Sequence, residues 1–257
     1  MAGAHYRAPV MGDSVPHSYI PYGGRRSGFY SSKVVDTLPC IYELVPIALE
    51  SVRSYPVCPG FVFTTADYGC ADGGTSMSLI YACVEELRKL HGNELEILVY
   101  YEDQPVNDFT SLFSYVQGLI SGPQSYLTSF PNVYVAASET QFYKQCFPRG
   151  SIQLGLFSVA LHWLSKKPCS VTGGLLCLQS QNQEERELFT RQAAMDWETF
   201  LLARAKELSL GLSDERTVEE KTTIVDEFFL HLEAEFARVM HDYRSELVAA
   251  IMKVEKN

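Results

Sequence analysis

The sequence predicts an α/β domain built around a mostly parallel sheet, and two observations carry this prediction. Short apolar runs alternate with helix-like segments between residues 60 and 165, in the order strand, helix, strand, helix, strand. The runs are almost continuously apolar, as is typical of strands buried on both faces. The chain has 257 residues, 46% hydrophobic and 20% charged, and is long enough to bury such a core without disulfides or metals.

The first part of the chain predicts an arm followed by a helix. Residues 1–28 are rich in Gly, Pro, Ser and Tyr, which favours a mobile arm or lid. Residues 30–54 carry apolar side chains at helical spacing, but Pro39 and Pro46 must start, kink or break this helix.

The middle part of the chain carries the predicted sheet. A buried strand that begins near Phe61 ends at Asp67 in a glycine-rich turn, and the spacing of apolar residues then predicts a helix. The remaining predicted elements are this helix over 77–90, a strand over 95–101, a helix over 107–119, and strands over 133–136 and 152–158.

After residue 178 the sequence favours helices only. One helix is predicted over 183–208, and a long amphipathic helix over 222–253 follows a polar connection. The apolar side of the first helix is predicted to consist of Phe189, Ala193, Trp197, Phe200, Leu201 and Leu208. The chain is therefore expected to have three parts, which are an arm over 1–28, an α/β domain over 29–208, and the connection with its long helix over 209–257.

Charge and cysteine content exclude several classes of partner. The formal net charge is −10, which argues against nucleic acid as the main partner and weakens the case for docking on anionic membranes. The seven cysteines form no C-x-x-C pair, so neither a disulfide framework nor a zinc or other metal site is expected. Since the N-terminus has no apolar signal region and no transmembrane stretch follows, we expect a soluble, cytoplasmic protein.

A glycine-rich loop, Asp67-Tyr68-Gly69-Cys70-Ala71-Asp72-Gly73-Gly74, follows the first strand. A strand that ends in an acid, then a glycine loop, then a helix is typical of a nucleotide or nucleoside site. Asp72 inside the loop would repel a pyrophosphate but suits a ligand with a positive centre, such as the sulfonium and ammonium of S-adenosylmethionine. The alternative is an ordinary strand–turn–helix connection whose glycines serve geometry alone.

Two further groups of polar residues follow later strands. Glu102 and Asp103 end the second strand, where a carboxylate can accept both hydroxyls of a ribose, although they could equally just end the strand. His162 and Trp163 follow the fourth strand and could grip a small acid, although a lone His and Trp in an apolar run are more often core residues.

Four ordered blocks of this sequence resemble the motifs of the SABATH methyltransferases, the salicylate, jasmonate and caffeine-type enzymes that use S-adenosylmethionine. The blocks are DYGCADG at 67–73, YEDQPVNDF at 101–109, FYKQCFP at 142–148 and LHWLS at 161–165. DWETFLLARAKEL at 196–208 resembles the helix that follows in the family, and the similarity runs in register from about residue 28 to 208.

The resemblance implies a Rossmann-like class I methyltransferase core with S-adenosylmethionine as cofactor. By analogy Asp67 and Gly69 line the methionine and adenosine pocket, and Asp103 binds the ribose hydroxyls. The candidate cofactor-binding residues are Tyr30, Asp67, Gly69, Asp72, Thr75, Asp103, Gln104, Gln141 and Phe142. The candidate substrate-binding residues are Thr37, His162 and Trp163, of which His162 and Trp163 are also the candidate catalytic residues.

The sequence also departs from the family pattern. A cofactor-binding Ser of the family falls on Val34, its substrate-binding Gln on Thr37, its loop Asn on Thr75, and an aromatic residue on Val159. The chain is shorter than family members, so we expect it to lack the last strands of the sheet and most of the helical cap.

Two functions follow from the resemblance. The first is methyl transfer to the carboxylate of a small organic acid, or to an N-heterocycle, with His162 and Trp163 aiming the acceptor and no base needed for a carboxylate. The second is a shortened, non-catalytic relative that binds the cofactor or a protein partner, with a homodimer as one outcome of an exposed fourth strand. A generic nucleotide-binding protein would explain the glycine loop but not the other blocks.

Overall fold

A four-stranded parallel sheet forms the centre of the structure, a computed structural model that describes residues 26–35, 38–158, 160–161, 163–172 and 180–209. The strands are β1 (Val62–Tyr68), β2 (Glu96–Asp103), β3 (Val133–Glu139) and β4 (Leu154–Phe157). Their order is β3-β2-β1-β4, and all neighbours are parallel. The predicted α/β fold is confirmed, and each predicted strand is present with its ends shifted by a few residues.

The strand order places a topological switch beside β1. The chain runs from β1 to β2 and β3 on one side, and then returns to β4 on the other side of β1. Asp67 is level with Tyr101 of β2 and with Leu156 of β4, so the three strands end at one edge. Ligands of open parallel sheets bind outside this carboxyl edge at the switch point, so this edge is the expected position of a binding site.

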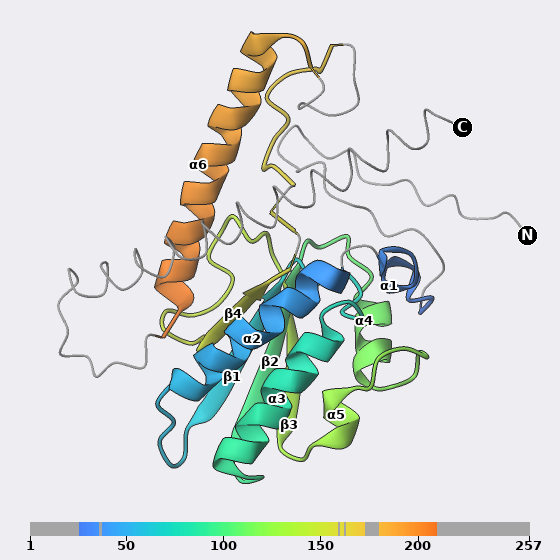
Figure 1. Ribbon diagram of the computed structural model, residues 1–257, viewed down its shortest axis with the longest axis vertical. Coiled ribbons are helices and arrows are strands. Elements are labelled where there is room, and N and C mark those ends of the chain that lie inside the picture. Colours follow the sequence, from blue (N-terminus) through green and yellow to red (C-terminus); the bar gives the residue numbers. More distant parts are fainter. Residues whose placement is uncertain (1–25, 36–37, 159, 162, 173–179, 210–257) are drawn as a thin grey trace, which may run out of the picture.

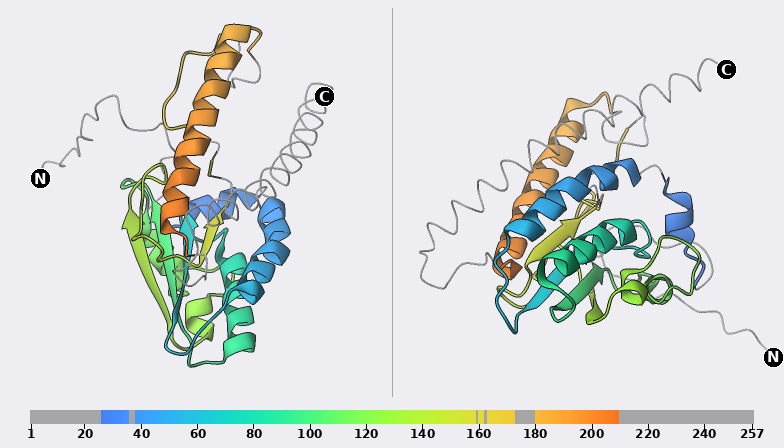
Figure 2. Two further views of the ribbon diagram at one scale, coloured as in Figure 1. Left: turned by 90° about the vertical axis from the view of Figure 1, so that its left-hand side faces the viewer. Right: turned by 60° about the horizontal axis from the view of Figure 1, so that its bottom comes forward.

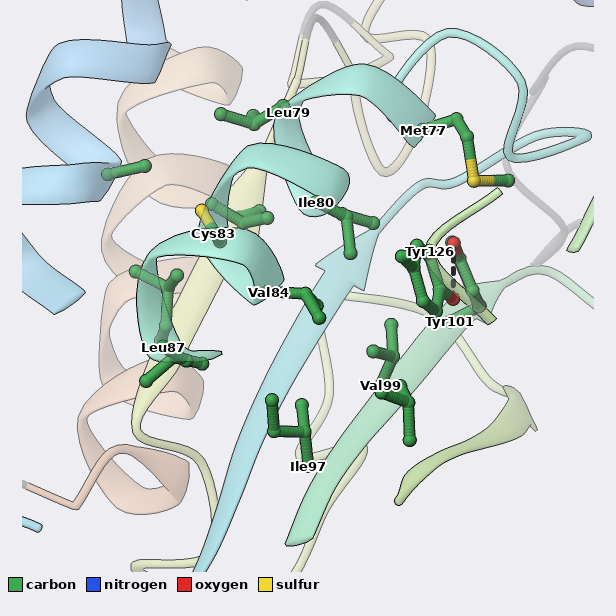
Figure 3. Packing of buried hydrophobic residues seen from close by; sticks show 14 of the residues in the cluster. Met77, Leu79, Ile80, Cys83, Val84, Leu87, Ile97, Val99, Tyr101 and Tyr126 are labelled. Atoms are coloured by element: carbon green, nitrogen blue, oxygen red, sulfur yellow. Dashed lines mark hydrogen bonds between the residues drawn. The ribbon is translucent and has the colours of Figure 1, made fainter. Parts of the chain in front are cut away.

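One face of the sheet is covered by α2 (Leu38–Ser54) and α3 (Met77–His91), as Figure 1 shows. The inner side of α3 is apolar at helical spacing and packs on β2 (Figure 3). The short helices α4 (Phe109–Val116) and α5 (Tyr126–Ser129) extend this core, and the hydroxyls of Tyr101 and Tyr126 share a buried hydrogen bond of 2.9 Å. The main apolar core therefore lies between these helices and the sheet.

The other face is covered at one end by α6 (Gln183–Glu207), whose first half extends beyond the sheet (Figure 2). The predicted apolar side of this helix is only partly right, because Phe200 is buried, four of the other five residues are half-buried, and Ala193 is exposed. The buried side is mostly polar and consists of Glu185, Gln192, Asp196, Phe200, Ala203, Arg204 and Glu207. The physical reason is that α6 packs on loop segments whose backbone groups need hydrogen-bond partners.

Three other predicted helices differ from the structure. The helix over 30–54 is divided into α1 (Phe29–Lys33) and α2, with Pro39 at the second position of α2, where its missing N–H costs little. The helix over 107–119 is shorter, because the side chain of Asp108 caps α4 by accepting from Ser111 N at 3.2 Å. The predicted helix over 222–253 lies outside the described residues, as does most of the arm over 1–28, so the three-part division stays a prediction.

Arg88 at the end of α3 ties this helix to the starts of β2 and β3. Its guanidinium is buried and donates to the carbonyls of Gly92, Leu95, Pro131 and Asn132 at 2.5–3.2 Å. These carbonyls belong to two loops, one before β2 and one before β3, so one buried side chain donates to both loops and joins them to α3.

Replacing Arg88 with Met should lower the free energy of unfolding by about 2 kcal/mol, because buried carbonyls lose their charged donor. Lys89→Met is the matched control, since Lys89 is exposed and its ion pair with Glu85 lies at the surface, where such pairs contribute little to stability. Urea denaturation of the two variants measures the difference. Equal losses in both variants would contradict this role of Arg88.

Among the described residues, no helix is both long and apolar enough to cross a bilayer.

Candidate functional site

The glycine-rich loop folds back onto the end of β2. The backbone N–H groups of Gly69 and Cys70 donate to the carbonyl of Glu102 at 2.8 and 3.1 Å. Asn107, in the loop after β2, donates from Nδ2 to the carbonyl of Ala71 at 2.7 Å. The predicted loop and the predicted pair of acids therefore meet at the switch point of the sheet.

Asp103 is held in one orientation by backbone donors. Its Oδ2 accepts from Ala71 N at 2.7 Å, and its Oδ1 accepts from Gln104 N at 2.8 Å. A carboxylate has two acceptor positions on each oxygen, so each oxygen of Asp103 can accept one further hydrogen bond. Two acceptors fixed side by side suit a pair of neighbouring hydroxyls, such as those of a ribose.

Three carboxyl groups gather at this edge. Asp67 is 2% exposed and accepts from Ser76 Oγ at 2.6 Å, and Glu102 is fully buried. Burial raises the pKa of Asp67 to about 7 and that of Glu102 to about 8, and the charge of Asp103 adds to both increases. The edge therefore disfavours further anions, and a ligand with a positive centre would relieve the repulsion.

Gly69 is the point where three loops approach one another. Its φ is +71°, a conformation that side chains disfavour. A Cβ at this position would lie 2.5 Å from the Cβ of Ala160, after β4, and 3.7 Å from the ring of Phe142, after β3. Thr140 Oγ1 donates to Glu102 at 3.3 Å, which holds the start of the segment after β3 at the edge. The structure thus brings Phe142 beside Gly69 and near the acids.

Asp72 lies at the contact between the loop and α1. It is 5% exposed, and its carboxylate accepts from the backbone N of Ser31 at 3.0 Å, from the hydroxyl of Ser31, and from Gly74 N at 3.3 Å. These contacts fasten α1, with Tyr30, against the glycine loop. The sequence analysis expected the carboxylate of Asp72 to face a cationic ligand, but in this structure both of its oxygens accept hydrogen bonds from protein groups.

The other predicted residues lie around the same edge. Thr75, Gln104 and Gln141 are half-buried, and Gln141 lies next to Phe142. The carbonyl of half-buried Trp163 accepts from the hydroxyl of Tyr143 at 2.6 Å, which links it to the Phe142 segment. Thr37, Val159 and His162 lie outside the described residues.

Ser158 is a candidate that the sequence analysis missed. It directly follows β4 at the switch point, and its Oγ is buried with no hydrogen-bond partner among the described residues. A buried hydroxyl without a partner is costly, so it marks a place where a ligand group could bind. The sequence could have indicated Ser158, because it is a polar residue at the end of a buried strand. Asp67 and Asp103 were selected for the same reason.

Comparisons with known proteins identify one family. The model of a family described as SAM dependent carboxyl methyltransferase matches residues 37–212. A probable S-adenosylmethionine-dependent methyltransferase of Arabidopsis thaliana is 29% identical over 227 residues, covering 82% of this chain and 59% of that protein. Indole-3-acetate O-methyltransferase 1 of the same plant is 29% identical over 185 residues, covering 66% of this chain and 48% of that protein.

A solved structure is similar as well. Loganic acid methyltransferase with SAH matches with a TM-score of 0.57 and 25% identity, over 74% of this chain and 55% of that chain. The present chain spans about half the length of the curated relatives it matches.

Proposed function

The chain belongs to the family of S-adenosylmethionine-dependent carboxyl methyltransferases, and from this premise we propose that it transfers a methyl group from S-adenosylmethionine to the carboxylate of a small organic acid. The observation that carries the proposal is the carboxyl edge of β1 and β2. There Asp103 presents two fixed acceptors beside a glycine loop, and two further buried acids favour a cationic ligand.

The residues at the edge fit the cofactor by chemistry. Asp103 would accept the two ribose hydroxyls, and Phe142, beside Gly69, offers a flat apolar ring for the adenine. The negative charge of Asp67 suits the methionine end, whose ammonium and sulfonium are positive. Gln104, Gln141, Thr75 and Tyr30 stay predicted contacts, and the carboxylate of Asp72 would act by holding α1 over the loop.

Catalysis in this proposal is positioning. The bound cofactor supplies an activated methyl group, and an acid substrate is already a nucleophilic carboxylate at neutral pH. The Trp163 side chain would orient the acceptor, while α1 and the glycine loop would exclude water from the site. Thr37 and His162 stay predicted acceptor contacts, and an N-heterocyclic acceptor, a homodimer and a cytoplasmic location likewise stay predictions.

The test of this function is a methyl-transfer assay with isotope-labelled S-adenosylmethionine. The acceptors are indole-3-acetate and loganate, chosen from the names of the similar proteins, together with small aromatic and aliphatic acids. We expect cofactor binding in a calorimeter and a labelled methyl ester with at least one acid. Binding without transfer to any acid would favour the non-catalytic relative, and absence of binding would refute the proposal.

Cofactor binding should release protons at pH 7. In the free protein burial places the pKa of Asp67 near 7 and that of Glu102 near 8, so both carboxyls are partly protonated at this pH. A cation bound beside them favours the ionised forms and lowers both pKa values, so protons leave and the affinity rises between pH 6 and pH 8.

Calorimetry at pH 7 in two buffers with different ionisation enthalpies measures this release. We expect the binding heat to depend on the buffer, and to depend on it less in the Asp67→Asn variant. A binding heat that is the same in both buffers would contradict the predicted ionisation.

A further inference from the structure

The buried polar side of α6 holds two loop segments of the proposed site. Arg204 and Glu207, near its end, bond to the segment that carries Phe142. Asp196, two to three turns earlier, bonds to the segment that carries Trp163. The two groups of contacts involve different residues of the helix, so each can be removed by its own substitution, although one hydrogen bond from Tyr143 to the Trp163 carbonyl joins the two loops.

Arg204 and Glu207 both form hydrogen bonds with the backbone of the Phe142 segment. The Arg204 guanidinium donates to the carbonyls of Phe142 and Lys144, each at 2.7 Å. The Glu207 carboxylate accepts from the backbone N–H groups of Cys146 and of Phe147, the latter at 3.2 Å. The two side chains also form an ion pair at 3.0 Å, with exposed fractions of 5% and 0%.

The same pair is fixed to the sheet. The hydroxyl of Tyr68, the last residue of β1, donates to Glu207 at 2.6 Å, and the Arg204 guanidinium lies over the Tyr68 ring at 4.2 Å. Tyr68 directly precedes Gly69, beside which Phe142 lies. The distance between the glycine loop and Phe142 is therefore set through one buried network.

Asp196 holds the Trp163 segment in a similar manner. Its carboxylate accepts from Ser165 N at 2.8 Å and from Ser165 Oγ at 2.5 Å. Gln192 donates to the same carboxylate at 2.8 Å, so Asp196 is itself held in place. Ser165 is two residues beyond Trp163. By holding Ser165, Asp196 therefore helps to position Trp163 on the acceptor side of the site.

We propose that Arg204 and Glu207 are positioning residues for the cofactor, and that Asp196 is a positioning residue for the acceptor. The proposal rests on the proposed function. A buried ion pair is weak evidence for stability, because desolvation of both charges opposes their attraction. The hydrogen bonds of this pair fix four backbone groups of one loop. A shift of a binding group by about 1 Å can lower affinity or reaction rate by a large factor.

The test is a crossed comparison of Glu207→Gln and Asp196→Asn in the full chain. We expect Glu207→Gln to raise the cofactor Kd about tenfold, measured by calorimetry, and to leave the acceptor KM at saturating cofactor within about twofold. We expect Asp196→Asn to raise the acceptor KM about tenfold and to leave the cofactor Kd within about twofold. Lys206→Gln and Glu198→Gln, on exposed positions of the same helix, are the matched controls.

Several results would overturn the proposal. If both variants change Kd and KM alike, or change only the melting temperature, α6 is a structural support and not a positioning element. If Glu207→Gln does not fold, Arg204→Lys replaces it, since lysine keeps the charge but cannot reach two carbonyls with a fixed fork. If the unsubstituted protein does not bind the cofactor, the proposed function itself has failed, and this outcome is distinct from equal binding by all variants.

Discussion

Replacing Asp103 with asparagine is expected to weaken S-adenosylmethionine binding about a hundredfold. Both carboxylate oxygens already accept a backbone N–H, from Ala71 and from Gln104. An asparagine has one oxygen, so its NH₂ group must face one of these donors, and the remaining oxygen loses its negative charge. Loss of two charge-assisted hydrogen bonds to the ribose corresponds to about 3 kcal/mol.

Calorimetric titration of the variant with the cofactor measures this loss. Glu139→Gln is the matched control, because Glu139 is the exposed end of β3 and pairs beside Asp103 in the sheet. It removes a negative charge from the same edge without touching the glycine loop. If the two variants bind the cofactor equally well, Asp103 does not hold the ribose, and the edge acts only through its overall charge.

Replacing Gly69 with alanine is expected to reduce the free energy of unfolding by about 3–4 kcal/mol. The positive φ disfavours any side chain, and the new methyl group would overlap the Cβ of Ala160 at 2.5 Å. The atom it meets is not the end of a flexible chain, so the loop after β4 must move as a whole. Cofactor binding should fall with it, because this loop and Phe142 both border Gly69.

Gly60→Ala separates the two causes. Gly60 has a similar φ of +76°, but a Cβ there would meet nothing within 4 Å. This control should therefore lose only about 1 kcal/mol, the cost of the backbone conformation. Adding Ala160→Gly to Gly69→Ala should recover part of the lost stability. Equal urea denaturation curves for the two alanine variants would show that the contact with Ala160 at position 69 does not affect the free energy of unfolding.

The central sheet and its binding edge could be predicted because local pattern was sufficient for them. The strands are buried apolar runs, and the acids and glycines follow them directly in the chain. The switch point is a consequence of the spatial order of the strands, which the structure shows. Asp67, Gly69, Asp103 and Phe142 come together there as expected.

Sequence pattern predicted the helix α6 but only part of its buried side, and the reason lies in its surroundings. Its apolar residues suggested a core-facing stripe, yet the buried side carries Asp196, Arg204 and Glu207. Hydrophobic periodicity predicts burial against apolar surfaces. It does not predict burial against loop backbone, where charged side chains are needed to satisfy N–H and carbonyl groups.

By itself, the sequence determined the order of strands and helices, the acidic and glycine-rich edge, and the similarity to carboxyl methyltransferases. Only the tertiary structure decided which partner each polar group has. Asp72 bonds to Ser31 in α1, Arg204 bonds to the carbonyl of Phe142, and Ser158 keeps a buried hydroxyl without a partner among the described residues. The first two contacts join residues 41 and 62 positions apart. Local periodicity carries no information on such pairs, because they form only when the folded sheet brings its loops together.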